Sequence, residues 1–154
     1  ESCKFNQVNL SSNFPFGKYD LILCLEVLEH IPNETILLTN IYKSLNKKGK
    51  LILSVPSIKS PLYKLGLTKN HDKKVGHLRR YSFEELEVLL KKAEYKILEI
   101  HRVEGILRNF LFINSVAQKL IRFIKGPISD FVTLVDNISV SLFGESDIII
   151  VARK

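Results

Sequence analysis

The segment from Glu26 to His30 places two carboxylates, Glu26 and Glu29, and one imidazole, His30, within five residues. It directly follows the apolar run Tyr19–Leu25, which is typical of a strand buried on both faces. In a helical turn, side chains at i, i+3 and i+4 share one face. Ligands of α/β sheets bind beyond the carboxyl ends of the strands. We therefore expect these three side chains to face a crevice and to take part in chemistry.

Composition indicates one ordinary globular domain over residues 1–154. The chain is 45% hydrophobic and 25% charged, and its length suits a single core. Its two cysteines, Cys3 and Cys24, lack the spacing of a metal or redox pair, which indicates a reducing, cytoplasmic compartment. No apolar run is long enough to span a bilayer. The chain begins with Glu1, and we expect a further segment upstream.

Most of the net charge of +7 lies between residues 59 and 80. This segment holds seven basic residues and a single acid, Asp72. A concentrated positive field beside a crevice raises the local concentration of anionic partners. The alternative is a solvated, mobile loop that is rich in lysine.

Strand and helix signals alternate along the chain. Asn33 is a candidate N-cap and Gly49 a candidate left-handed residue after the same helix. Ser82 to Glu85 form a capping-box pattern for a second helix. The alternation predicts an α/β fold with a mostly parallel sheet. The expected strands are Phe5–Leu10, Tyr19–Leu25, Leu51–Val55, Tyr95–Val103 and Asp147–Ala152.

Residues 105–143 interrupt this alternation with a predicted insertion of two helices, divided at Gly126-Pro127. The insertion could cover the core, form a lid over the crevice, or lie on a membrane surface. The membrane alternative depends on basic residues beside aromatic ones. These residues are Arg108, Lys119, Arg122 and Lys125 with Phe110, Phe112 and Phe123.

Three stretches, residues 14–30, 45–56 and 76–86, together resemble the carboxyl-terminal two-thirds of a class I S-adenosylmethionine-dependent methyltransferase. The resemblance implies a partial Rossmann-like sheet whose final strand is antiparallel. It also implies that Asn9, Leu10, Cys24 and Leu25 bind the cofactor. The chain contains no Gly-x-Gly-x-x-Gly turn, so we expect it to be part of a longer protein and to bind the cofactor poorly alone. We expect Asn9, Leu25 and His30 to share one cavity.

Within this superfamily, the Glu-x-x-Glu-His pattern followed by a later histidine resembles two metal-dependent groups, the small-RNA 2′-O-methyltransferases and the O-methyltransferases of ubiquinone biosynthesis. The resemblance implies that Glu26, Glu29, His30 and His77 could hold a divalent metal such as Mn²⁺, Co²⁺, Zn²⁺ or Mg²⁺. Alternatively, His30 or His77 is the catalytic base, because a neutral imidazole accepts a proton near pH 7.

The expected function is methyl transfer to an acceptor, most simply an oxygen of an anionic small molecule, lipid or glycan. Arg79, Arg80 and Tyr81 are candidate contacts for its anionic group, because an arginine fork pairs well with phosphate or carboxylate. Two alternatives stay open on the same fold. One is a non-catalytic binding or membrane-peripheral module, and the other is an RNA 2′-O-methyltransferase. The sequence does not determine the oligomeric state.

Overall fold

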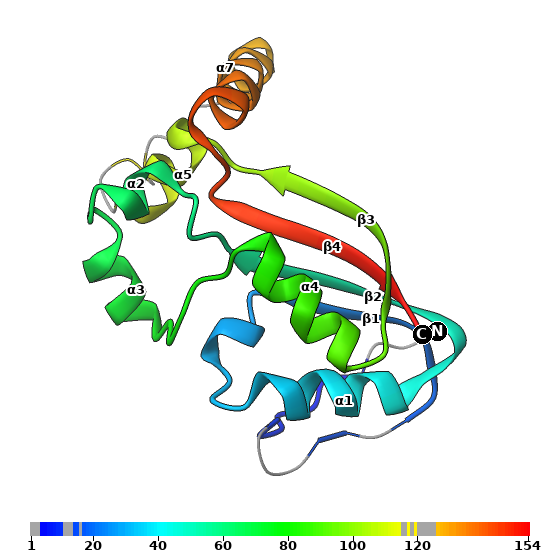
Figure 1. The fold of residues 1–154 in the computed structure, drawn as a ribbon. Helices are drawn as coiled ribbons and strands as arrows, with labels where there is room; N and C mark the ends of the chain where they lie inside the picture. Colours follow the sequence, from blue (N-terminus) through cyan, green and yellow to red (C-terminus); the bar gives the residue numbers. More distant parts are fainter. Residues whose placement is uncertain (1–3, 11–13, 16, 115–116, 118, 120–125) are drawn as a thin grey trace.

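The computed structural model describes residues 4–10, 14–15, 17–114, 117, 119 and 126–154. A single sheet holds four strands in the order β1-β2-β4-β3 (Figure 1). The strands are β1 (Tyr19–Leu25), β2 (Leu45–Pro56), β3 (Lys96–Val103) and β4 (Asp147–Arg153). β1 and β2 pair in parallel, and β4 lies antiparallel between β2 and β3. The first three strands therefore run in one direction and end at the same edge of the sheet, and the predicted α/β class is confirmed.

Helices α1 (Glu34–Ser44) and α4 (Phe83–Lys92) lie together on one face of the sheet (Figure 1). Both helices begin where the sequence predicts. Asn33 caps α1 by accepting a hydrogen bond from the Ile36 N–H, and Ser82 and Glu85 form a complete capping box for α4. The core lies between these two helices and the strand residues, every second one along a strand, whose side chains face the helices. It includes Leu37, Leu38, Leu51, Leu53, Leu86, Leu90, Ile148 and Ile150, each at most 2% exposed.

The opposite face and the free edge of β1 are open among the described residues. Leu21, Leu23 and Leu25 alternate with inward-facing residues of β1 and are about half exposed, at 50, 57 and 48%. In the described sheet β1 pairs only with β2. In the family that the sequence resembles, a further strand lies on the other side of this strand. An exposed apolar edge of this kind favours association with a further segment or chain.

Three local predictions are wrong. Residues 5–10 form no strand, because none of the described strands lies beside them to accept their backbone hydrogen bonds. Gly49 lies within β2, and it is Lys48 that has the left-handed φ of 69°. Gly49 is needed there for close approach, since a Cβ would lie 3.0 Å from the Tyr19 carbonyl oxygen. The basic segment is not an irregular loop, because it contains α2 (Pro61–Lys64) and α3 (Lys69–Val75).

The region between β3 and β4 contains α5 (Ile106–Ile113) and α7 (Pro127–Phe143), and Pro127 begins α7 as predicted. The buried carboxylate of Asp136 on α7 accepts hydrogen bonds from the backbone N–H groups of Gly105 and Arg108 at the start of α5. It also pairs with the Arg108 guanidinium, and although burial opposes this, these donors hold the pKa of Asp136 below its usual range. The start of α5 is thereby fixed to α7. Arg122, Phe123 and Lys125, which carried part of the membrane alternative, lie outside the described residues.

Candidate functional site

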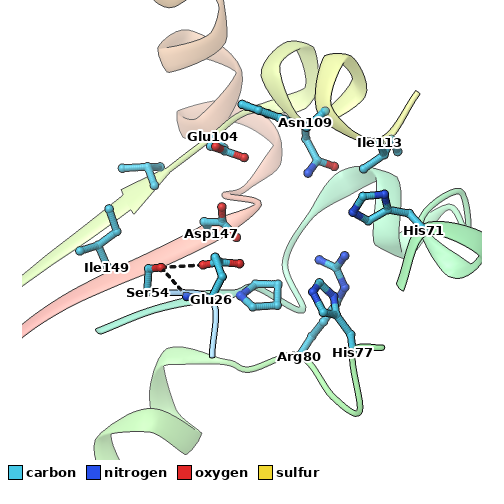
Figure 2. Close-up of a pocket in the computed structure, with 13 residues that line it drawn as sticks. Glu26, Ser54, His71, His77, Arg80, Glu104, Asn109, Ile113, Asp147 and Ile149 are labelled. Carbon is cyan, nitrogen blue, oxygen red and sulfur yellow. Dashed lines mark hydrogen bonds between the residues drawn. The ribbon is translucent and has the colours of Figure 1, made fainter. Parts of the chain in front are cut away.

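The carboxyl ends of β1, β2 and β3 border a cavity of about 400 Å³, which we call the main cavity because it lies at the predicted site. Glu26 follows β1, Glu104 follows β3, and β4 begins at Asp147 beside Pro56 and Val103. Helix α5 contributes Asn109, Phe112 and Ile113 to the opposite wall, and the basic segment contributes His71, His77 and Arg80 (Figure 2). Polar groups from four strands and two other segments therefore meet at one place, as expected for this edge of an α/β sheet.

Glu29, His30 and His77 form a compact group beside this cavity, which we call the histidine cluster. Each residue offers one ligand atom, and these atoms lie within 4.8 Å of one another. The Nε2 atoms of His30 and His77 are both 3.7 Å from Oε1 of Glu29. Glu29 and His30 come from the short 3-10 turn η1 (Leu28–His30) directly after β1. The Leu78 N–H donates to the Glu29 carbonyl at 3.0 Å, which holds the segment that carries His77 against that turn.

Fixed acceptors orient both imidazoles of the histidine cluster. Nδ1 of His30 lies 3.0 Å from the Gly76 carbonyl oxygen, which can only accept. Nδ1 of His77 lies 3.0 Å from the Asp72 carboxylate. With the proton on Nδ1 in each ring, both Nε2 lone pairs are left to face Glu29. Burial lowers the pKa of His77 despite the nearby Asp72, which favours this neutral form.

The Glu29 carboxylate is fully buried, and neither oxygen accepts a hydrogen bond from any residue that the structure describes. Burial raises the pKa of Glu29 to about 7, with the charge of Glu26 adding to the effect. A buried carboxylate without a donor costs free energy. The Nε2 lone pairs of His30 and His77 face this carboxylate, and none of the described residues donates a hydrogen bond to it. A cation bound between the three groups would interact favourably with all of them.

Asp72 connects the histidine cluster to the basic segment. It accepts two hydrogen bonds from Arg80, at 2.6 and 3.1 Å, and one from Thr68 at 2.9 Å. Burial opposes its ionisation, but the Arg80 guanidinium and these hydrogen bonds hold the pKa of Asp72 below its usual range. Asp72 is therefore an anion that fixes the ring of His77, the arrangement found behind ligating and proton-accepting histidines.

Glu26 is not among the three clustered ligand residues, although its side chain interacts with that of Glu29. Its backbone has a left-handed φ of 52°, and its carboxylate accepts a hydrogen bond of 2.6 Å from the Ser54 hydroxyl (Figure 2). The i, i+3, i+4 spacing predicted a shared face, but the backbone turns sharply at Glu26 and the helical turn begins only at Leu28. The structure thus brings together three of the four expected metal ligands.

The three candidate acceptor-binding residues, Arg79, Arg80 and Tyr81, all line a further cavity of about 540 Å³ beside α4, but their side chains have different partners. Arg79 pairs with Glu34 and also donates to the Pro32 carbonyl, which ties it to the start of α1. Tyr81 is 2% exposed, and its hydroxyl donates to Glu34 and to the Leu28 carbonyl. Arg80 lines the main cavity, although Asp72 neutralises its charge. Contact of these residues with an acceptor remains a prediction.

The expected cofactor residues separate into two groups. Leu10 and Cys24 line a second cavity of about 310 Å³ that wraps the free edge of β1. Burial raises the pKa of the Cys24 thiol to about 12, so Cys24 is a neutral, apolar lining residue. Leu25 and Asn9 are exposed. Asn9, Leu25 and His30 line neither this cavity nor the main one, and the expected common cavity is therefore not found in these two.

Sequence reasoning missed Asp72, Glu104, Asn109 and Asp147. Glu104 and Asp147 could have been found by the rule that selected Glu26, since each lies at the carboxyl edge next to an expected strand. Asp72 and Asn109 lie on helices whose position against the sheet is a tertiary property. No local pattern signals them.

Comparison with known proteins gives a consistent assignment. A family described as "Methyltransferase domain" matches residues 4–100. A putative methyltransferase from Bacillus halodurans superposes with a TM-score of 0.60 at 18% identity, covering 96% of this chain and 70% of that protein. A SAM-dependent methyltransferase from Archaeoglobus fulgidus has a TM-score of 0.56 at 23% identity, covering 91% of this chain and 61% of that one. A SAM-dependent methyltransferase from Mesorhizobium loti has a TM-score of 0.61 at 9% identity, covering 97% and 68%.

No protein with curated annotation matches the chain by sequence. The chain spans less than two thirds of several of the solved structures that it resembles, among them the Archaeoglobus fulgidus protein. At these low identities the superpositions show only that the fold is shared. Membership of the family follows from the family match, which covers more than half of the chain.

Proposed function

The chain belongs to the methyltransferase domain family, with a class I S-adenosylmethionine-dependent fold, and on this premise we propose that it transfers a methyl group to an acceptor held in the main cavity. The observation that carries the proposal is the histidine cluster, whose His77 also lines that cavity. S-adenosylmethionine supplies an electrophilic methyl group on a sulfonium. Leu10, in the apolar cavity along β1, would contribute to its adenine side, and Cys24, which lines the same cavity, to its methionyl side.

The chemistry required of the protein is modest. The acceptor oxygen attacks the methyl carbon, the carbon–sulfur bond breaks with its electrons staying on sulfur, and S-adenosylhomocysteine leaves. The proton of the acceptor passes to Nε2 of His77, whose Nδ1–H is held by Asp72. Orientation of the two reactants supplies much of the rate of such a transfer.

The histidine cluster also fits a divalent cation. Two imidazoles and one buried carboxylate that receives no hydrogen bond from the described residues are a mixed nitrogen and oxygen set, which suits Zn²⁺, Co²⁺ or Mn²⁺. When bound, such an ion would lower the pKa of an acceptor hydroxyl. Glu29, His30 and His77 would hold it, with Asp72 and the Gly76 carbonyl orienting the rings.

Cobalt absorption tests the metal site directly. We expect one Co²⁺ per chain with visible d–d bands, lost in His77→Ala and retained in His101→Ala, whose exposed histidine lies on β3. Equal cobalt binding by both variants, or none by the parent protein, would leave His77 with the role of base alone.

The acceptor itself is a finer proposal. We expect an oxygen nucleophile on a molecule with an anionic group, which the basic segment would attract from outside the cavity. RNA is an alternative acceptor with the same charge. Its binding would weaken steeply with salt, whereas binding of a small molecule would depend on salt much less.

A non-catalytic or membrane-peripheral role is the competing function. α7 exposes several apolar side chains, including Phe131, Leu134, Ile138 and Leu142. Its range carries Asp130 and Asp136 but no lysine or arginine, which does not favour an anionic membrane. In the part of the chain that the structure describes, no helix is long and apolar enough to cross a bilayer.

Titration calorimetry with S-adenosylhomocysteine separates enzyme from binding module. The protein is taken with the full natural sequence in which this chain occurs. We expect saturable binding, and methyl transfer from labelled S-adenosylmethionine to acceptors in a cell extract. No binding of S-adenosylhomocysteine would defeat the proposed function.

A further inference from the structure

Three carboxyl groups converge on the main cavity from separate strands, and we call them the acidic rim: Glu26 after β1, Glu104 after β3, and Asp147 at the start of β4 (Figure 2). We propose that the acidic rim binds a positively charged group of the acceptor, of the ammonium class. This inference rests on the proposed function, since it names the chemistry of a ligand for the same cavity. The acidic rim would bind the end of the acceptor that lies inside the cavity, whereas the basic segment would attract the part that lies outside it.

The cations that act on the acidic rim, Arg108 on Glu104 and Arg80 on Asp147, are each already paired with another carboxylate. Among the described residues that line the cavity, Arg80 is the only arginine or lysine, and Asp72 already engages its guanidinium through two hydrogen bonds. Arg80 also stacks over the Tyr63 ring, with its Cζ 4.9 Å from the ring centroid, which fixes it further. His71 and His77 are the other basic side chains on the wall, and burial favours the neutral form of His77.

The carboxyl groups of the acidic rim are buried close to one another, and those of Asp147 and Glu104 also hydrogen-bond each other. Burial, together with the charges of Glu26 and Glu104, raises the pKa of Asp147 to about 8. Burial likewise raises the pKa of Glu104. Like charges in one desolvated site disfavour each other's ionisation, and an entering cation reverses that effect. A cation is therefore the ligand charge that this wall favours.

An independent group points into the same space. Asn109 on α5 is only 8% exposed, and its side-chain oxygen accepts from the Ser60 hydroxyl at 3.4 Å. Its amide nitrogen donates no hydrogen bond to any residue that the structure describes, and it points into the cavity in Figure 2. A side-chain donor that faces a cavity and has no partner among the described residues is available to a ligand acceptor atom or an ordered water.

The remaining wall suits an organic ligand. Val103, Ile113 and Ile149 give the cavity apolar surface between the acidic rim and Asn109. A volume of about 400 Å³ lies in the range of small-molecule pockets, which combine an apolar lining with a few placed polar groups. The arrangement thus fits a molecule with an alkylated or primary ammonium and a nearby hydrogen-bond acceptor, more than it fits a bare metal ion.

Three isosteric probes test the sign of the charge without knowledge of the true acceptor. Choline, 3,3-dimethyl-1-butanol and 3,3-dimethylbutyrate have nearly the same shape and carry a positive, zero and negative charge. Their binding to the complete protein is measured by saturation-transfer and chemical-shift NMR at pH 8. We expect choline to bind about tenfold more tightly than the alcohol, and the carboxylate not to bind measurably.

Two neutralising substitutions identify the rim as the cause. In the double variant Glu104→Gln Asp147→Asn, we expect the preference for choline over the alcohol to fall to about twofold or less, while binding of the alcohol is retained. The matched control Glu99→Gln Asp20→Asn neutralises an exposed residue of β3 and one at the far end of β1, and should keep the full preference. Circular dichroism confirms that both variants are folded.

A second measurement does not depend on the variants. Carbon-13 NMR of the Asp147 carboxyl in the parent protein should show its pKa fall by at least one unit when choline is bound, because the cation favours the ionised form. The inference is overturned if choline and the alcohol bind equally, if no probe binds, or if the preference survives in the double variant. Normal binding of S-adenosylhomocysteine in these cases would leave the proposed function standing.

Discussion

The histidine cluster and the acidic rim lie at the same edge of one sheet, yet their surroundings differ in kind. In the histidine cluster, the N–H of each ring is held by a fixed acceptor, and the free lone pairs face one buried carboxylate. In the acidic rim, three carboxyl groups face one cavity with no unengaged cation among the described lining residues. A carboxyl group at a strand end is thus directed towards proton transfer, metal binding or cation binding by its neighbours, not by its position alone.

Removal of His77 should separate the two regions most strongly. In His77→Ala we expect the rate of methyl transfer to fall by about 100-fold or more, because the proton acceptor is lost. The affinity for S-adenosylhomocysteine should not change. The readout is single-turnover transfer of a labelled methyl group, with His101→Ala as the control. An unchanged rate in His77→Ala would contradict the assigned role of the cluster.

Asp72→Ala should destabilise the fold through the support of the histidine cluster. The Arg80 guanidinium, with its side chain 5% exposed, would lose its carboxylate partner and remain as a buried charge. We expect a loss of about 3 kcal/mol in the free energy of unfolding, measured by urea denaturation. Asp20→Ala, at an exposed site on β1, loses only the hydrogen bond from Asn46 and should change it by about 1 kcal/mol or less. A small effect of Asp72→Ala would mean that Arg80 finds another partner.

The acidic rim should make stability depend on pH. The folded pKa of Asp147, about 8, lies above its ordinary value of 3.8, so the folded state binds the proton more tightly. Its contribution is therefore fully present below about pH 4 and is lost as the pH rises towards 8. Asp147→Asn should remove this loss and raise the free energy of unfolding at pH 9 by on the order of 1 kcal/mol. Denaturation curves of both proteins at pH 5 and pH 9 check the sign.

Ser54→Ala should have the smallest effect on stability of these variants, and it should leave the Glu26 side chain of the acidic rim less firmly held. Its hydroxyl donates to the Glu26 carboxylate at 2.6 Å and accepts from the Glu26 N–H at 3.1 Å. Loss of both bonds should cost about 1 kcal/mol in stability. Ser141→Ala, at an exposed position of α7, is the matched control. If the two variants are equally stable, Ser54 does not hold Glu26 in place.

Most of the secondary structure was predictable because its signals are local. Asn33 caps its helix through a bond three residues away, and Ser82 and Glu85 close a capping box over the same distance. The apolar run Tyr19–Leu25 became a strand for the same reason. The predicted strand at residues 5–10 failed because a strand needs a neighbour, and its hydrogen bonds are not local.

The candidate site was predictable in part. Glu29 and His30 share one turn, and the later His77 was expected beside them. The place of Glu26 was not predictable, because a left-handed backbone and the hydroxyl of Ser54, 28 residues away, turn it into the cavity. Glu104 and Asp147 stand at the ends of expected strands, but that they share one cavity depends on the insertion of β4 between β2 and β3.

By itself the sequence determined which residue types stand at the strand ends, how the helices begin, and which family the chain resembles. These properties depend on neighbours within a few positions along the chain. Only the tertiary structure decided that Asp72 holds the ring of His77, that Gly76 holds that of His30, and that three carboxyl groups share a cavity. The reason is physical, since a side chain's partner is set by the packing of whole helices and strands against one another.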